Sequence, residues 1–264
     1  MTNLNTKMPH FQTSICVVIN SDKSKHDLEE CIDSALQLSS NCMVVDFGTI
    51  DEIAKIAEKK QIKVIQHPFI NYIEPVRNFE IQSSDSEWVF LMDEDERITT
   101  ELADEIKNVV TSEEFSYYRL PRKEYFAKKV WLKNGGWWPN TQIRLIKKSA
   151  FIDWPAQIHS FPKIEGNEGQ LNNALLHYSK NDYEQIVNKT INFEDIESDL
   201  LFKADKPVNT LTFFRKFLGE LYRRLIKAKG YKDGTIGVIE SIYQAFSKTI
   251  TYLYLYEKKN SRTV

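Results

Sequence analysis

The sequence predicts an α/β protein with a Rossmann-like, mostly parallel central sheet and a C-terminal helical extension. Short apolar runs alternate with helical patterns over the first hundred residues, one of these runs ends in four consecutive acids, and apolar residues recur at helical spacing beyond about residue 182. Strands that alternate with helices over short links are typical of a right-handed, mostly parallel sheet.

The individual elements follow from these patterns. Apolar runs predict strands over residues 14–19, 42–45, 62–65 and 88–92, and helical spacing predicts helices over 28–38, 53–60 and 75–83. Further strands are expected over 117–120, 142–146 and 171–178. The tail predicts helices over 211–229 and 236–256, joined by a turn at 230–234.

An acidic cluster follows the strand expected over 88–92: Asp93, Glu94, Asp95 and Glu96. Ligands bind beyond the carboxyl ends of strands in such sheets, and a divalent cation with bound phosphates would relieve the repulsion among crowded acids. Alternation along an extended segment would place Asp93 and Asp95 on one face. In the alternative interpretation, the acids begin the next helix.

Two other strand ends belong to the same expected edge of the sheet. Asn20 follows the first strand and Asp46 follows the second. Because parallel strands end at one edge, Asp46 and Asp93 are expected to converge where a ligand binds.

Composition limits the class of protein. The formal net charge of −2 over 264 residues argues against a nucleic-acid partner, although two stretches are basic. Residues 119–148 hold nine Lys and Arg against Glu124, and residues 213–232 hold seven against Glu220. Such stretches suggest an anionic ligand or surface, or a solvated face. Three cysteines without paired spacing, and no apolar signal or spanning segment, favour the cytoplasm.

The ordered motifs resemble glycosyltransferase family 2: an Asp ending the second strand, Arg77-Asn78 before the fourth, and an Asp-x-Asp-Glu ending it. Residues 131–140, 142–145, 158–159 and 176–179 resemble its lipopolysaccharide core β-1,4-glucosyltransferase branch. The resemblance runs from about residue 14 to 179 and more weakly to 234. It implies a GT-A catalytic domain over 1–181, with a nucleotide-sugar half at about 12–100, an acceptor half at about 115–181, and an extension over 182–264.

The resemblance implies an inverting transfer from a nucleotide diphosphate sugar. Asn20 and Asp46 would contact the nucleotide, and Asp93 and Asp95 would bind Mn²⁺ or Mg²⁺, mainly through Asp95. Arg77 would grip phosphate, because metal and cations stabilise the departing diphosphate. The alternative for Arg77 is a surface arginine near a helix start.

Acceptor contacts are expected from the aromatic segment and the residues that follow it. Trp137 and Trp138 would stack on sugar rings, although for at least one of them a core position is favoured. Arg144 would bind phosphate or pair with an acid. His159 and His177 would lie near the diphosphate or acceptor, with His177 as a further metal ligand, or would be core histidines.

The general base is the position at which this chain departs from the family pattern. Ser160 stands where many relatives carry Glu after the histidine, and a hydroxyl cannot act as a base near neutral pH. The replacement candidates are Asp153 and Glu165, followed by Glu94 and Glu96.

The resulting hypothesis is a metal-dependent transferase that acts on a cell-surface glycan or lipid-linked acceptor at the inner face of the membrane. The alternatives are a non-catalytic nucleotide- or carbohydrate-binding module and a sugar nucleotidyltransferase, although residues 20–24 lack the glycine that a triphosphate loop needs. The helix over 211–229 joins an apolar stripe to a basic face. We expect the stripe to pack internally and the basic face to be free to contact anionic lipid.

Overall fold

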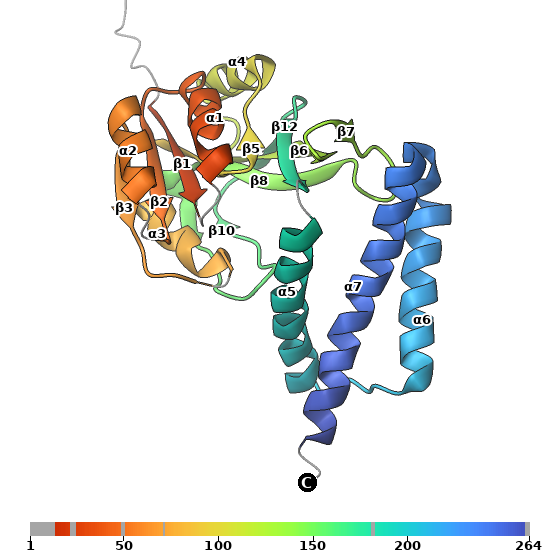
Figure 1. Ribbon diagram of the computed structural model, residues 1–264. Coiled ribbons are helices and arrows are strands. Elements are labelled where there is room, and N and C mark those ends of the chain that lie inside the picture. Colours follow the sequence, from red (N-terminus) through yellow and green to blue (C-terminus); the bar gives the residue numbers. More distant parts are fainter. Residues whose placement is uncertain (1–13, 22–24, 49–50, 71, 181–182, 262–264) are drawn as a thin grey trace, which may run out of the picture.

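The computed structural model describes residues 14–21, 25–48, 51–70, 72–180 and 183–261 (Figure 1). Its first half is the predicted parallel sheet. β1 (Ile15–Ser21) lies between β2 (Cys42–Asp46) and β4 (Trp88–Asp93), and β3 (Lys63–Gln66) pairs with β2 at the edge. All three pairings are parallel, so the four strands end at one edge.

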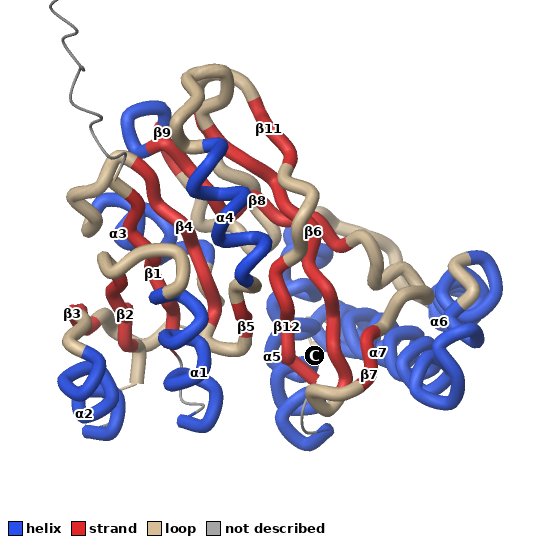
Figure 2. Tube along the Cα trace, turned by 90° about the horizontal axis from the view of Figure 1, so that it is seen from above, coloured by secondary structure: helices blue, strands red, loops and turns tan. Residues whose placement is uncertain are grey.

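The second half of the sheet is mixed (Figure 2). β8 (Asn140–Lys147) pairs antiparallel with both β4 and β6 (Tyr117–Phe126), and β12 (Leu175–Lys180) runs parallel to β6. The shorter strands are β5 (Glu96–Arg97), β7 (Val130–Trp131) and β11 (Glu168–Gln170) in this sheet, and the separate pair β9 (Phe151–Asp153) and β10 (Lys163–Ile164). The strand expected over 171–178 is therefore displaced: β11 ends before it and β12 begins within it.

Helices cover both faces of the sheet. Buried side chains of α1 (Lys25–Leu36), α2 (Asp51–Lys60) and α4 (Thr100–Val109) share one core with alternate residues of β1 and β4. The opposite residues of these strands pack with η1 (Glu74–Val76) and α3 (Arg77–Gln82), which together replace the single helix expected over 75–83. A strand buried on both faces explains the continuous apolar run of β4.

The C-terminal extension consists of long helices that leave the sheet on the side where β1 ends (Figure 1). They are α5 (Tyr183–Lys203), α6 (Thr210–Leu221) with the π-helical turn η3 (Tyr222–Lys227), the 3₁₀ turn η4 (Gly230–Asp233), and α7 (Gly234–Asn260). The predicted boundary at 181–182 falls outside the described residues, so the domain division stays a prediction. None of the described helices is both long and apolar enough to cross a membrane.

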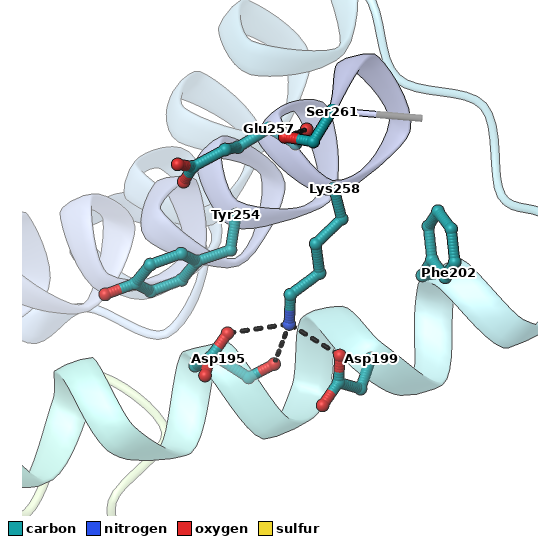
Figure 3. A pocket seen from close by; sticks show the side chains of 7 residues that line it. All are labelled: Asp195, Asp199, Phe202, Tyr254, Glu257, Lys258 and Ser261. Carbon is teal, nitrogen blue, oxygen red and sulfur yellow. Dashed lines mark hydrogen bonds and ion pairs between the residues drawn. The ribbon is translucent and has the colours of Figure 1, made fainter. Parts of the chain in front are cut away.

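Polar side chains join α5 to α7. Glu194 accepts hydrogen bonds from Ser247 (2.6 Å) and Thr251, and Lys258 binds Asp195 and Asp199 at 2.6 Å each. Figure 3 shows Lys258 reaching across a shallow pocket between the two helices. Because Lys258 pairs with Asp195 and Asp199 inside this pocket, we interpret the pocket as part of the packing between α5 and α7.

The apolar stripe of the extension does not pack as we expected. Leu211, Phe214 and Leu218 are 73%, 62% and 56% exposed. The internal-packing prediction is wrong for these residues, because α6 meets α7 through another side, where Phe213 lies 6.4 Å from Tyr256 between ring centroids.

The turn between α6 and α7 depends on two glycines. A Cβ on Gly237 would lie 2.0 Å from the carbonyl oxygen of Gly230, whereas a Cβ on Gly219, within α6, would meet nothing within 4 Å. We therefore expect Gly237→Ala to lower the free energy of unfolding by about 1–3 kcal/mol. Gly219→Ala, the matched control, should raise it by up to about 1 kcal/mol, because alanine favours the helix. Urea unfolding of both variants measures the difference, and equal effects would contradict the close approach.

Candidate functional site

The ends of β1, β2 and β4 bring the expected donor-side residues to one edge. The registers pair Asn20 with Asp93 and Ser21 with Asp46, so Asp46 and Asp93 lie two strands apart, roughly 10 Å by the usual strand spacing. Asp46 is buried, and its Oδ1 accepts a hydrogen bond from the Gly48 amide at 2.8 Å. The expected convergence at this edge is confirmed.

The acidic cluster turns sharply after β4. Residues 94 and 95 form a turn, so the alternation predicted for an extended segment is wrong. Glu96 folds back and accepts a hydrogen bond from the Asp93 amide at 2.9 Å, and Glu94 accepts one from the Ser21 hydroxyl at 2.6 Å. In the alternative interpretation, the helix start at residues 99–100 is confirmed, because α4 begins at Thr100 with Thr99 as its cap, but the acids before it are not solvated, since Glu94 and Glu96 are buried.

Two buried arginines hold the Asp93 carboxylate. Arg144 donates to Oδ2 at 2.7 Å, Arg77 donates to Oδ1 at 3.3 Å, and the Asn20 amide donates to Oδ1 at 3.2 Å. Burial alone would raise the pKa of Asp93, but Arg144 and Arg77 outweigh it and hold that pKa well below its usual range. The surface alternative for Arg77 is wrong, since the residue is 4% exposed and its guanidinium lies 5.6 Å from the centre of the Trp154 ring.

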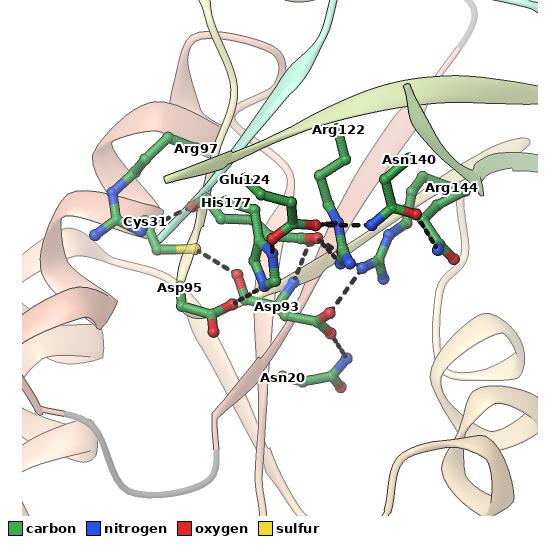
Figure 4. A network of polar contacts seen from close by, with 12 residues as sticks. Asn20, Cys31, Asp93, Asp95, Arg97, Arg122, Glu124, Asn140, Arg144 and His177 are labelled. Atoms are coloured by element: carbon green, nitrogen blue, oxygen red, sulfur yellow. Dashed lines mark hydrogen bonds and ion pairs between the residues drawn. The ribbon is translucent and has the colours of Figure 1, made fainter. Parts of the chain in front are cut away.

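A second layer of ion pairs surrounds Glu96, and Figure 4 shows its partners Arg122 and Arg144 beside Glu124 and His177. Its Oε1 accepts from Arg144 at 2.7 Å and from Arg122 at 3.0 Å, and Glu96 is completely buried. Arg122 also donates to Glu124 at 3.0 Å. Arg144 thus pairs with acids, the second of the two roles expected for it.

His177 connects this network to Asp95. Its Nδ1 lies 2.5 Å from Glu124 Oε2, and its Nε2 lies 3.3 Å from Asp95 Oδ1. Burial and Arg122 lower the pKa of His177, but Asp95 and Glu124 outweigh them and raise it to about 9. The Asp95 pKa is lowered, because the attraction of the imidazolium exceeds the effect of burial. A carboxylate that orients a histidine toward a second carboxylate is a common arrangement behind metal ligands.

The donor set at Asp95 fits a cation that brings its own oxygen ligands. No three His, Cys, Asp or Glu of the described residues are arranged to hold a metal by themselves. Asp95 Oδ1 is buried and makes no hydrogen bond of good geometry, and His177 Nε2 faces it. Mg²⁺ and similar ions commonly take one or two protein ligands and complete their shell with waters and substrate phosphates. Asp93 fits less well, since both of its oxygens are already bonded.

The aromatic segment lies against the C-terminal extension. Trp137 is half-buried, with the Arg224 guanidinium 4.7 Å from its ring centre, and Trp138 packs edge-on against Trp131 at 5.3 Å. Asn134 bonds Asp233 through its amide and its side chain, at 2.7 and 2.6 Å. Neither Trp137 nor Trp138 is a fully buried core residue.

The structure separates the two candidate bases. Asp153 Oδ1 accepts a hydrogen bond from Asn78 at 3.0 Å, and Asn78 follows Arg77, which binds Asp93. Glu165 is exposed, and its amide bonds Ala150, which follows the end of β8 that pairs with the start of β4. Glu165 therefore lies at the opposite edge of the sheet and is not brought to the site.

The segment around His159 reaches the extension as well. The His159 side chain is 68% exposed, and its Nε2 lies 3.0 Å from Glu197 of α5. Its amide donates to Glu74 of η1 at 2.8 Å, so this residue bridges the donor-side turn and the helices. Ser160 donates to the Pro155 carbonyl at 2.5 Å.

Glu124 and Arg122 are the site residues that the sequence did not reveal as such. Glu124 stood out only as the one acid among nine basic residues, and that stretch was interpreted as a surface or ligand contact. Two basic residues of that stretch, Arg122 and Arg144, instead form ion pairs with buried acids. The alternation of Arg122 and Glu124 along one strand was the available signal.

Comparison with known proteins finds similar sequences, similar structures and a matching family. Two relatives are uncharacterized glycosyltransferases: one of Rickettsia conorii, 25% identical over 242 residues (86% of this chain, 84% of the relative), and one of Rickettsia prowazekii, 25% identical over 237 residues (84% and 79%). The crystal structure of S. aureus TarS 1-349 superposes with a TM-score of 0.49 at 15% identity, over 94% of this chain and 91% of that chain. Residues 14–162 match the model described as Glycosyl transferase family 2. This match covers more than half of the chain, so the protein is a GT-A-fold member of glycosyl transferase family 2.

Proposed function

We propose that this glycosyltransferase is a metal-dependent, inverting enzyme that takes a sugar from a nucleotide diphosphate sugar. The observation that carries the proposal is the pairing of Asp95 with His177 beside the buried arginines at the edge where β1, β2 and β4 end. Asn20 and Asp46 lie along that edge and would contact the nucleoside. Asp95 and His177 would hold Mn²⁺ or Mg²⁺, which would stabilise the charge of the departing diphosphate.

Arg77 would contribute positive charge toward the donor phosphates. It donates to Glu80 at 3.0 Å as well as to Asp93. Burial, however, raises the pKa of Glu80 to about 7 despite the opposing charge of Arg77. Glu80 therefore neutralises this arginine only in part near neutral pH, so Arg77 balances Asp93 and would still attract an incoming phosphate.

The acceptor would bind on the side of the loops that reach the extension. Trp138, half-buried, and the exposed His159 are the available contacts, while Trp137 is partly used by Arg224. Arg144 would act indirectly, by holding Asp93. We propose a cell-surface glycan or lipid-linked acceptor on the cytoplasmic side of the membrane, with the lipopolysaccharide core as the finer assignment from the sequence motifs. In an inverting displacement, Asp153 would take the proton of the attacking acceptor hydroxyl.

Asp95 is the first residue to test. We expect Asp95→Asn to abolish the Mn²⁺-dependent part of nucleotide diphosphate binding and to lower sugar transfer or donor hydrolysis at least about 100-fold, because one metal oxygen is lost. Thermal shift with a panel of nucleotide diphosphates, with and without Mn²⁺, measures binding, since a ligand of the native state raises the melting temperature.

The matched control is Asp104→Asn, an exposed acid on α4. It should leave binding and turnover unchanged. Wild-type activity in Asp95→Asn would refute the proposal, and binding without any turnover in the wild type, across donors and acceptors, would favour a non-catalytic module.

The pH dependence of metal binding tests His177. A metal must displace the proton from an imidazole whose pKa is about 9, so Mn²⁺ affinity should rise up to about tenfold per pH unit from pH 6.5 to 8.5. His177→Asn should flatten this slope, as measured by calorimetry with Mn²⁺ alone. Without metal the sign is reversed: the raised pKa adds stability that is complete below about pH 6.5 and is lost as the pH rises through about 9. An unchanged slope in the variant would remove His177 from the metal site.

The two candidate bases make opposite predictions. Asp153→Asn should lower kcat by about 100- to 10,000-fold with little change in nucleotide binding. Glu165→Gln should change kcat less than about twofold, because a surface residue away from the site contributes little. Steady-state kinetics of the two variants decide between them, and the reverse pattern would show that Asp153 only holds Asn78.

A further inference from the structure

The C-terminal extension carries its apolar residues on the outside. On α6 and η3, the exposed side chains Leu211, Phe214, Leu218, Tyr222 and Ile226 recur every three or four residues. On α7, a second exposed row has the same period and consists of Ile239, Ile242, Phe246, Leu253 and Tyr256. A scattered apolar residue on a surface is ordinary, but two regular rows are a contiguous feature that needs an explanation.

Several buried residues of α7 are polar, which is the reverse of the usual arrangement with apolar residues inside and polar residues outside. Glu240 and Thr251 are completely buried, and Ser241 and Ser247 are nearly so. Ser241 donates to the Gly237 carbonyl at 2.7 Å, and Ser247 and Thr251 bond Glu194 of α5. Small and polar residues thus make many of the buried contacts of α7, beside Ala245, Tyr252 and Leu255, while other large apolar residues point outward.

Helix geometry places the two rows on the same side. α6 and α7 run antiparallel, because Phe213 near the start of α6 meets Tyr256 near the end of α7. Tyr252 faces α6, because Lys216 lies over its ring. At 3.6 residues per turn, Phe246 is rotated from Tyr252 by about a third of a turn around the axis of α7. Phe214 is rotated from Phe213 by about a quarter of a turn around the axis of α6, in the same direction when each helix is viewed from its own N-terminus. Equal offsets in an antiparallel pair point to one side, so the rows form one surface.

The charge of residues 210–256 indicates what kind of partner the apolar surface binds. Residues 210–256 contain eight Lys and Arg and three Asp and Glu, a positive excess of five in a chain whose formal net charge is −2. The three acids are already paired or buried: Glu220 binds Arg223 and Arg224, Asp233 binds Asn134, and Glu240 is buried. A second copy would bring the same positive excess, whereas an anionic lipid surface complements both the charge and the apolar rows.

We propose that the outer side of α6, η3 and α7 docks on the interface of an anionic membrane, with its apolar rows among the headgroups and acyl chains. The neighbouring basic residues Arg215, Lys227, Lys229 and Lys232 contact lipid phosphates. The inference does not depend on the proposed function, although it would bring the enzyme to a lipid-linked acceptor. In the described part of the chain no helix spans a membrane, so the contact is interfacial.

Vesicle flotation of the full chain tests the docking. The wild type should float with vesicles of equal parts phosphatidylglycerol and phosphatidylcholine, and should bind pure phosphatidylcholine at least about tenfold more weakly. Raising NaCl should weaken binding, as screening demands. The double variant Phe214→Ser/Phe246→Ser should lose at least about tenfold in binding. Both phenylalanines are exposed, at 62% and 54%, so the fold should survive, which circular dichroism checks.

Matched controls separate the surface from general effects. Phe161→Ser removes an equally exposed phenylalanine (66%) from the catalytic domain and should bind vesicles normally. Arg215→Gln/Lys227→Gln should weaken binding to the anionic vesicles, whereas Lys55→Gln/Lys63→Gln, on the α/β domain, should not. Asp95→Asn should float like the wild type, so loss of activity and loss of docking are distinguishable.

The overturning results are equally definite. Wild-type flotation by the double phenylalanine variant, or equal binding to both vesicle types, would refute the proposal. A stable dimer in sedimentation equilibrium that the double variant converts to monomer would assign the surface to a second copy instead.

Discussion

The site depends on two buried arginines that bind the two carboxylate oxygens of Asp93, one each. The side chains of Arg77 and Arg144 are only 5% exposed, and a charge at such depth is costly unless it is paired, so removal of Asp93 would leave two buried cations with one partner fewer. Arg77 comes from α3 and Arg144 from β8, so the pairing joins the parallel half of the sheet to the mixed half. The arginines are in turn fixed by Glu80 and Glu96. The position of the strand end is thus set by charge as well as by sheet register.

The same network has a charge balance that suits metal chemistry. Apart from Glu80, whose pKa is raised to about 7, the network has four carboxylates and four positive groups: Asp93, Asp95, Glu96 and Glu124 face Arg77, Arg122, Arg144 and the imidazolium of His177. Exchange of the His177 proton for a divalent cation would add one positive charge to a cluster that is already neutral. A diphosphate would then be favoured over water as the next ligand. In this way the frame that stabilises the fold without metal would prepare the site for an anionic donor.

Local sequence patterns predicted the elements that depend on local forces, and missed what depends on distant pairing. The parallel strands and the shared edge of Asp46 and Asp93 follow from apolar runs and chain direction. The turn at residues 94–95 does not, because it is set by the pairing of β5 with β12, about eighty residues away. The role of Glu124 is hidden for a related reason: Arg122 lies two residues away on the same strand, but His177 comes from β12, whose register against β6 no short window contains. The packing of the C-terminal stripe was predicted wrongly because helical periodicity identifies an apolar face without identifying what covers it.

The helices of the C-terminal extension contact the loops that we propose for acceptor binding, and these contacts link the apolar surface to the proposed site. Asn134 binds Asp233 in the turn before α7, Gly135 bonds Ala228 and Arg224, and His159 reaches Glu197 of α5. The contacts of Asn134 and Gly135 fix their loop to the turn between the two helices that present the apolar rows, and His159 contacts α5, which packs against α7. An extension held at a lipid surface would therefore set the distance and direction from that surface to the acceptor loops. A soluble glycan would gain nothing from such a constraint, whereas a lipid-linked acceptor would have its reactive hydroxyl brought to a defined height, which favours the lipid-linked class over the free glycan.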